Sequence, residues 1–141
     1  MQLPAAPTPF GTYVETVQTG NLLFFSGMLP VVDRKPKYLG RLGKELNIET
    51  GREAAYTAAL NVLAAAKQHL GSLDRVTRVV RLGVFIATSG DFFDQPRVAD
   101  AVSDLRDVFG IEKTSVRVVI GVASLPLGVP IGLDVIFEVA E

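Results

Sequence analysis

The chain has 141 residues and a formal net charge of −1, from 14 Lys and Arg residues against 15 Asp and Glu residues. This length suits one domain, residues 1–141, with a single core. The balanced charge argues against nucleic-acid binding, which normally needs a basic surface. Cysteine is absent and histidine occurs once, so we expect no disulfide framework, no thiol nucleophile and no metal site.

Hydrophobic residues make up 48% of the chain, yet no stretch approaches the roughly 18–20 uninterrupted apolar residues that span a bilayer. We therefore expect no membrane segment. A small domain with this much apolar surface is expected to bury part of it against copies of itself. The N-terminal residues Met1 to Pro9 lack the positively charged region of a signal peptide, so the expected location is the cytoplasm.

The first third of the chain predicts a β-hairpin. Residues 12–17 alternate in polarity, residues 19–21 (Thr-Gly-Asn) are typical of a turn, and the apolar run 22–25 follows. The polar, Gly- and Pro-bearing stretch 31–47 is predicted to be a connection, in which a short strand near Tyr38 can form.

A long helix is predicted next. Thr50 and Glu53 fit a capping box, in which the two side chains each accept a hydrogen bond from a free backbone N–H of the first turn. Gly71 suits the position just after the last turn. Small and apolar residues recur between them at helical spacing, at Ala55, Ala58, Ala59, Val62, Ala66 and Leu70. This alanine-rich face predicts close packing on a sheet.

The second half of the chain predicts three more strands and a second helix. Residues 76–86 are rich in β-branched side chains and predict a central strand. The segment 94–96 begins a helix that ends at Gly110, and strands 115–123 and 131–140 follow. The order β-β-α-β-α-β-β predicts an α+β fold with both helices on one sheet face. The other face would be apolar and uncovered, which is the physical reason to expect an oligomer.

Arg117 interrupts an otherwise apolar strand. Strand alternation places it on one face with Val119 and Gly121. A buried, unpaired guanidinium is very costly, so this side chain must find an anion or reach water at a sheet edge. Either Asp134 or Glu138 of the next strand pairs with it, or its planar fork binds the carboxylate of a small ligand.

The run from Arg117 to Gly128, RVVIGVASLPLG, resembles the C-terminal signature of the RidA/YjgF family, the reactive-intermediate deaminases. In that family an arginine precedes an alternating strand that ends in a Leu-Pro turn. Residues 11–14 and 20–30 also resemble the family, and residues 91–110 resemble a branch with a Gln-Pro insertion before the second helix. Together the four segments span nearly the whole chain and occur in the family's order.

The resemblance implies a chorismate-mutase-like fold and a homotrimer with a barrel-like centre and three clefts between adjacent subunits. Active members hydrolyse enamine or imine intermediates such as 2-aminoacrylate to a 2-keto acid and ammonia, without a metal or a cofactor. The position that matches Arg117 binds the substrate carboxylate. We place Val119, on the same strand face, in the same ligand-binding site. The implied partner is a small imino or keto acid.

At Gly132 the sequence departs from the family pattern. Active members have a glutamate there that helps to position the hydrolytic water, whereas glycine can neither accept a proton nor orient water. Asp134 lies two residues on, on the same strand face, and could partly substitute. Two hypotheses follow: a deaminase in which Arg117 and Asp134 are the catalytic residues, or a non-enzymatic binder of small carboxylates and keto acids.

Three N-terminal residues match positions of the family's cleft. Tyr13 can stack on a flat ligand and give one hydrogen bond, or it can make a cross-strand aromatic contact. Ser26 and Gly27 match a Ser-Gly pair before a proline turn. Glycine permits a close backbone approach to a ligand, but a plain hairpin end needs the same residues, so both roles stay open.

Other features are interpreted as structural. His69 fits a partner of the helix C-terminus, and the aspartates at 100, 104 and 107 fit a solvated stripe. The arginines between 75 and 81 fit a solvated surface cluster. Ribonuclease activity, a label often attached to the family, is disfavoured by the near-neutral charge and by the absence of a basic groove.

Overall fold

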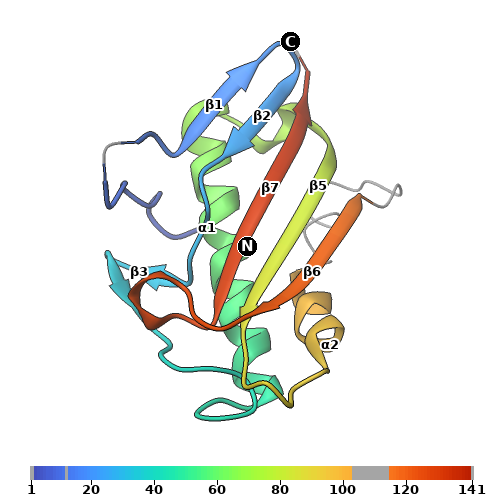
Figure 1. Ribbon diagram of the computed structural model, residues 1–141. Coiled ribbons are helices and arrows are strands. Elements are labelled where there is room, and N and C mark those ends of the chain that lie inside the picture. The colour runs from blue at the N-terminus through green and yellow to red at the C-terminus, as the bar shows by residue number, and fades with distance from the viewer. Residues whose placement is uncertain (1, 12, 103–114, 141) are drawn as a thin grey trace.

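The computed structural model describes residues 2–11, 13–102 and 115–140. Its main sheet has five strands: β1 (Thr16–Thr19), β2 (Leu22–Phe25), β5 (Val76–Ala87), β6 (Val116–Val122) and β7 (Ile131–Val139). They lie in the order β1-β2-β7-β5-β6 (Figure 1). Neighbouring strands are antiparallel except β5 and β6, which run parallel. β6 is therefore an edge strand of the described sheet.

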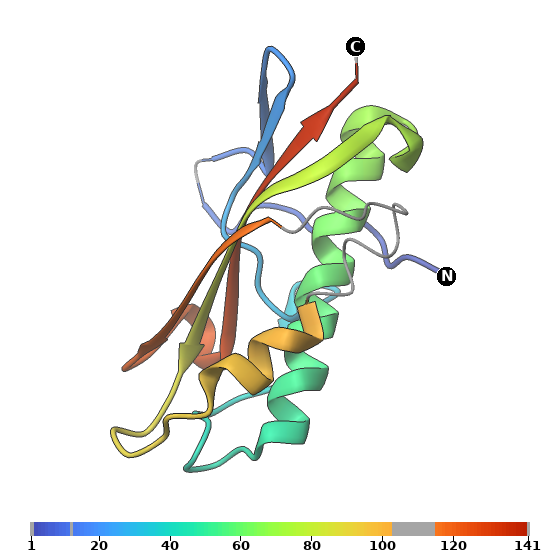
Figure 2. The same cartoon turned by 90° about the vertical axis from the view of Figure 1, so that its right-hand side faces the viewer.

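The helices lie on one face of this sheet (Figure 2). α1 (Ile48–Leu70) is the long one, and α2 (Gln95–Ala99) continues into the 3-10 turn η2 (Asp100–Val102). Two further 3-10 turns are η1 (Leu73–Arg75) and η3 (Pro126–Gly128). The arrangement confirms the predicted α+β fold with both helices on one side.

The core lies between α1 and the sheet. The rings of Phe25 and Phe137 meet edge to face, with centroids 5.0 Å apart. Six alanines of α1 are at most 4% exposed: Ala54, Ala55, Ala58, Ala59, Ala65 and Ala66. Because alanine has no side chain beyond Cβ, this face lets the helix pack close to the strands. The predicted role of the alanine-rich face is confirmed.

The predicted start of α1 is wrong. The N-cap is Asn47, whose Oδ1 accepts a hydrogen bond from the backbone N–H of Thr50 at 2.8 Å, so Thr50 and Glu53 lie inside the helix. Asparagine is at least as good an N-cap as threonine. The earlier start also places Gly51 against Leu42, where a Cβ would come within 2.7 Å of Leu42 Cδ1. Only glycine fits this contact without a shift.

The other helix boundaries in the described residues agree with the sequence pattern. Gly71 ends α1 with a φ of 82°, and its N–H donates to the carbonyl of Lys67 at 2.8 Å. Pro96 stands in the first turn of α2, as expected for a residue that lacks an N–H. The predicted continuation of the second helix to Gly110 lies outside the described residues. Within them, no helix is long and apolar enough to cross a membrane.

β1 begins later than predicted, at Thr16 rather than at residue 12. The two residues before it are held to the end of β2 by Ser26. Ser26 donates from its hydroxyl to the Val14 carbonyl and from its backbone N–H to the Glu15 carbonyl. The turn into β2 falls at Gly20, with a φ of 56°, as predicted.

A small hairpin of β3 (Val31–Val32) and β4 (Lys35–Pro36) replaces the predicted short strand near Tyr38. Its two turn residues, Asp33 and Arg34, have φ of 53° and 65°. A two-residue turn of this kind favours Asn-Gly, because the left-handed conformation costs a non-glycine residue roughly 1–2 kcal/mol. Tyr38 instead packs, partly buried, against the core.

Within the described residues, both α-helices lie on the first face of the sheet, and the second face is left without one (Figure 2). Strand register places Val17, Phe24 and Ile120 on it, and they are 38–54% exposed. Arg81 and Asp134 lie on the same face, so it is not wholly apolar as predicted. The uncovered face is confirmed, and it is apolar with a charged pair among its side chains.

Candidate functional site

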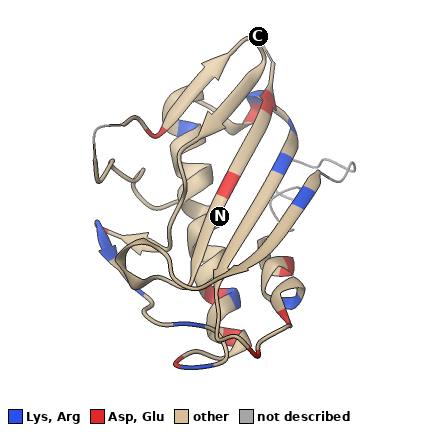
Figure 3. Cartoon of the chain, in the orientation of Figure 1, with Lys and Arg blue, Asp and Glu red and all other residues tan. Residues whose placement is uncertain are grey.

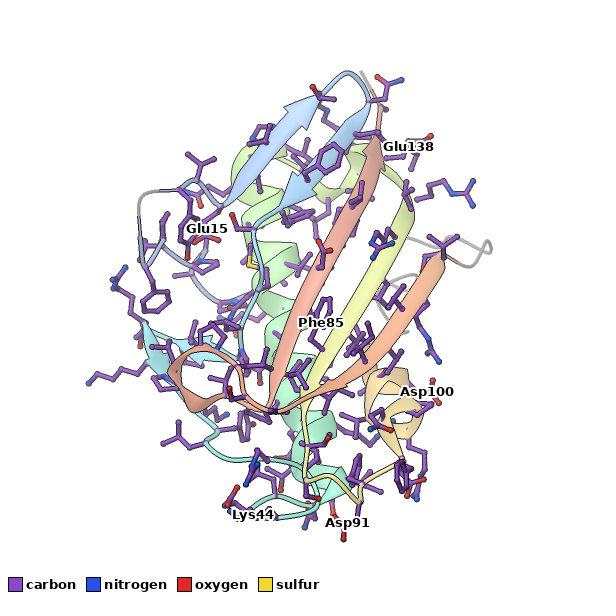
Figure 4. All side chains as sticks on the ribbon, viewed as in Figure 1. Glu15, Lys44, Phe85, Asp91, Asp100 and Glu138 are labelled. Atoms are coloured by element: carbon purple, nitrogen blue, oxygen red, sulfur yellow. The ribbon has the colours of Figure 1, made fainter. Side chains whose placement is uncertain are left out.

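A hollow of about 420 Å³ opens on the uncovered face of the sheet, beside the start of β7. Four segments of the chain form its walls: the chain before β1, the chain after β2, the C-terminal end of β5, and η3 with the start of β7. Figure 4 labels Phe85, the β5 side chain that lines it. The residues that bear on its chemistry are Tyr13, Gly27, Phe85, Leu125, Gly132 and Asp134.

One wall of the hollow is the segment before β1, residues 8–11 and 13–15, called the N-terminal arm below. Tyr13 is 45% exposed, and its Oη accepts a hydrogen bond from the backbone N–H of Phe10 at 3.1 Å. The backbone N–H of Tyr13 donates to the Gly11 carbonyl at 3.0 Å. Among the described residues, the hydroxyl proton of Tyr13 has no acceptor, so it remains available to a ligand.

Ser26 and Gly27 have different roles. Ser26 fastens the N-terminal arm, since its Oγ donates to the Val14 carbonyl at 2.5 Å and its N–H donates to the Glu15 carbonyl at 2.8 Å. Ser26 does not line the hollow, whereas Gly27 does. A Cβ at Gly27 would meet nothing within 4 Å, so the hollow is open next to this backbone.

Gly132 forms part of the floor, directly opposite Phe85 across the β5–β7 pair. A Cβ at Gly132 would lie 3.7 Å from Leu125 Cδ2 and 3.7 Å from Leu29 Cδ2, which is ordinary van der Waals contact. A Cβ is therefore accepted at this position, and packing at the Cβ does not require glycine.

Asp134 lines the hollow and pairs with Arg81. Asp134 Oδ2 lies 3.9 Å from Arg81 Nε, and both side chains are partly exposed, at 48% and 38%. Figure 3 shows the acidic and basic segments on the adjacent strands β7 and β5. Asp134 and Gly132 share the uncovered face, as the alternation predicted. The carboxylate thus lines the hollow while it pairs with Arg81.

Arg117 points the other way. In the β5–β6 register it lies beside Leu82, a core residue that is 3% exposed. Its Nη1 donates to Asp100 Oδ1 of η2 at 2.9 Å, and the two side chains are 34% and 58% exposed. The predicted structural pairing with Asp134 or Glu138 is therefore wrong, because those side chains lie on the opposite sheet face. Figure 4 labels Asp100 beside this edge.

Two further β6 residues, Val119 and Gly121, lie on the same helix-facing side as Arg117. Val119 packs, partly buried, against the core, and a Cβ at Gly121 would come within 2.8 Å of the Gln95 side chain of α2. The helix-facing side of β6 thus holds Arg117 and Val119. The hollow holds Tyr13, Gly27 and Asp134 on the uncovered side.

Sequence reasoning missed two charged partners. Arg81 was assigned to a solvated cluster, although alternation along β5 puts it on the same face as Gly83 and Phe85 and could have identified it. Asp100 was assigned to a solvated stripe, and no sequence signal links it to Arg117. His69, near the end of α1, hydrogen-bonds Gln18 Oε1 at 2.9 Å and so joins the helix to β1.

No group of three or more His, Asp or Glu side chains among the described residues is placed to hold a metal ion. The polar groups of the hollow are a phenol, a carboxylate and open backbone. Such groups suit a small organic ligand that is gripped by hydrogen bonds and ring contacts.

The helix-backed sheet, with one parallel edge pair and one uncovered face, defines a chorismate-mutase-like α+β protein. The family model described as "YjgF/chorismate mutase-like, putative endoribonuclease" matches residues 1–139. The chain belongs to this family, and the resemblance found in the sequence is confirmed.

Relatives agree with this assignment. Protein TCP17 of Trypanosoma cruzi is 41% identical over 140 residues, which cover 98% of this chain and 88% of that protein. The crystal structure of Atu1372 from Agrobacterium tumefaciens, a protein of unknown function, is 33% identical with a TM-score of 0.90, covering 99% of this chain and 86% of that one. A 2-iminobutanoate/2-iminopropanoate deaminase of Dermatophagoides farinae is 28% identical over 123 residues, covering 87% and 82%.

Proposed function

We propose that this chain is a homotrimeric enamine/imine deaminase of the RidA type, acting on 2-aminoacrylate-like intermediates. The observation that carries the proposal is the division of the candidate residues between the two sheet faces. Tyr13, Gly27 and Asp134 line the hollow, while Arg117 lies across the sheet on the edge strand β6. A second copy packed on the uncovered face would bring its own β6 edge, with Arg117, to the hollow. The site is then completed between subunits, as the family resemblance implies.

Arg117 would bind the substrate carboxylate. Only its Nη1 makes a hydrogen bond to the described residues, with Asp100, so its other N–H donors are available for a two-pronged contact. An ion pair as exposed as this one contributes only about 0–1 kcal/mol. A ligand carboxylate can therefore share or replace the contact with Asp100 at little cost.

The other residues of the site would position the hydrolytic water and hold the substrate. The oxygen of water adds to the C=N carbon of the imino acid, and the two protons of that water are transferred in turn to the nitrogen. The C–N bond then breaks, so that ammonia is released and a 2-keto acid remains. Asp134 is the side chain of the hollow that can orient this water and accept its proton. Tyr13 and Phe85 would hold the planar substrate by ring contact. Positioning would supply most of the rate enhancement.

The test generates 2-aminoacrylate in situ and follows its decay with wild type, Arg117→Ala and Arg117→Lys. We expect the alanine variant to lose activity roughly a hundred-fold, as when one well-placed charged contact is removed. The lysine variant should be intermediate, because it keeps the charge but loses the fork. Equal rates for wild type and Arg117→Ala would refute the proposal.

Gly132 favours a second candidate, a non-enzymatic binder of small carboxylates or keto acids. The floor of the hollow lacks a side chain where active family members are expected to carry glutamate. Binding of 2-ketobutyrate that depends on Arg117, without turnover of 2-aminoacrylate, would identify this function in place of the first.

Gly132→Glu separates the two candidates. The surrounding space accepts a Cβ in ordinary contact, so the variant should fold. If the wild type is a binder, the new carboxylate should create deaminase activity, and if it is an enzyme, activity should rise roughly ten-fold or more. The matched control is Gly132→Gln, which has nearly the same size but no base. Equal activity of the Glu and Gln variants would show that the carboxylate at this position is irrelevant.

A further inference from the structure

The N-terminal arm forms a wall of the hollow without belonging to a strand or a helix. Ser26 fastens its end near β1, at the Val14 and Glu15 carbonyls. The other end carries Phe10, which also lines the hollow. The position of this wall therefore depends on what holds the chain near Phe10.

Arg34, in the turn between β3 and β4, holds that end. Its Nη1 donates to Thr8 Oγ1 at 2.5 Å and to the Pro9 carbonyl at 3.1 Å. Its Cζ lies 4.7 Å from the centroid of the Phe10 ring, within the range of a cation–π contact. One side chain thus contacts three successive residues of the arm.

Arg34 is linked to Tyr13 through Phe10. Phe10 is tied to Tyr13 by the hydrogen bond from its backbone N–H to the Tyr13 hydroxyl, at 3.1 Å. Because both rings line the hollow, a shift of Phe10 also removes the restraint on Tyr13.

Arg34 keeps this role in an unfavourable backbone conformation. Its φ of 65° and the φ of 53° at Asp33 are values at which glycine would be easier to accommodate. Strained non-glycine residues persist where surrounding contacts fix them, and they concentrate at ligand clamps. The side chain of Arg34 supplies such contacts, whereas Asp33 makes no side-chain hydrogen bond or ion pair to the described residues.

We propose that Arg34 is a positioning residue of the hollow. It clamps the N-terminal arm so that Phe10 and Tyr13 form a fixed aromatic wall, and it thereby sets the affinity for small planar carboxylates. Arg34 itself does not line the hollow and does not touch the substrate. The proposal rests on the proposed function, because it assumes that the hollow is where the carboxylate ligand binds.

The experiment compares Arg34→Gly with Asp33→Gly. Both variants place glycine at a positive φ and relieve strain in the same turn, but only the first removes the clamp. Thermal stability should be kept or raised in both. The dissociation constant for 2-ketobutyrate should rise roughly five- to ten-fold in Arg34→Gly and stay at the wild-type value in Asp33→Gly. Arg34→Lys should lie between, because it keeps the charge but not the fork.

Amide hydrogen exchange without ligand provides a second readout. The N–H groups of Phe10 and Tyr13 are both hydrogen-bonded in the arm, and they should exchange faster only in Arg34→Gly. Unchanged affinity in Arg34→Gly, or an equal loss in Asp33→Gly, would overturn the proposal. If wild type binds no 2-ketobutyrate, the proposed function fails instead. The exchange rates then decide alone whether Arg34 clamps the arm, and unchanged rates refute it.

Discussion

The carboxylate of Asp100 is the group that a ligand would have to compete with at Arg117. It accepts a hydrogen bond from Arg117 Nη1 at 2.9 Å and carries a negative charge next to the expected position of the ligand's own carboxylate. Two like charges on one guanidinium repel each other, with an energy that salt screens at an exposed site.

Asp100→Asn is therefore expected to tighten 2-ketobutyrate binding by roughly two- to five-fold at low ionic strength, with a smaller effect at high salt. Calorimetric titration at two salt concentrations measures this, and Asp94→Asn serves as a control aspartate at the start of α2. Weaker binding in Asp100→Asn would instead show that Asp100 is needed to orient the arginine.

For single residues, the sequence predicted part of the lining of one hollow, but it did not predict on which face of the sheet each residue lies. Tyr13, Gly27 and Asp134 were predicted as site residues, and the structure brings them into one hollow. Arg117 was predicted with them, but its alternation within β6 says nothing about which face of the sheet β6 turns toward the helices. Its contact with Asp100 joins residues 17 positions apart in the chain, and no local pattern encodes such a contact.

The start of α1 offers a test at the scale of one element. Asn47 supplies the cap through its Oδ1, while the Thr50 side chain makes no cap hydrogen bond. Asn47→Ala should lower the free energy of unfolding by about 1 kcal/mol. Thr50→Ala should change it by a few tenths at most, since alanine is the better helix former inside the first turn. Urea unfolding of both variants measures the difference, and a larger loss in Thr50→Ala would restore the capping box first predicted there.

The elements themselves were largely predictable because their patterns are strong. The bounds of β2 and the end of α1 at Gly71 agree with the prediction to the residue. Both are marked by local signals, an apolar run between turn residues and a glycine that can adopt the left-handed conformation. The start of α1 was not predicted, because Asn47 and Thr50 are both residues that favour the N-cap, and no local pattern separates them. The β3–β4 hairpin was missed because Asp33 and Arg34 are not the residues that such a turn favours.

At the scale of the whole molecule, a second copy of this chain would both cover the open sheet face and complete the divided site. Val17, Phe24 and Ile120 are apolar and 38–54% exposed on this face, and apolar side chains gathered on one open face are typical of an interaction surface. The hollow opens on the same face, and the β6 edge that carries Arg117 is unpaired within the described residues. A homotrimer that covers this face would bury the apolar side chains and join the two parts of the site.

Subunit mixing tests this central claim most directly. Arg117→Ala removes the carboxylate-binding arginine, and Gly27→Trp places a large ring beside the hollow, at a position where a Cβ meets no atom within 4 Å. Each variant alone should bind no 2-ketobutyrate. When the two are unfolded together in equal amounts and refolded, about a quarter of the sites should pair an intact Arg117 with an intact hollow from a neighbouring subunit. Titration should recover binding at that fraction of sites with wild-type affinity, whereas a mixture that binds nothing would contradict a site shared between subunits.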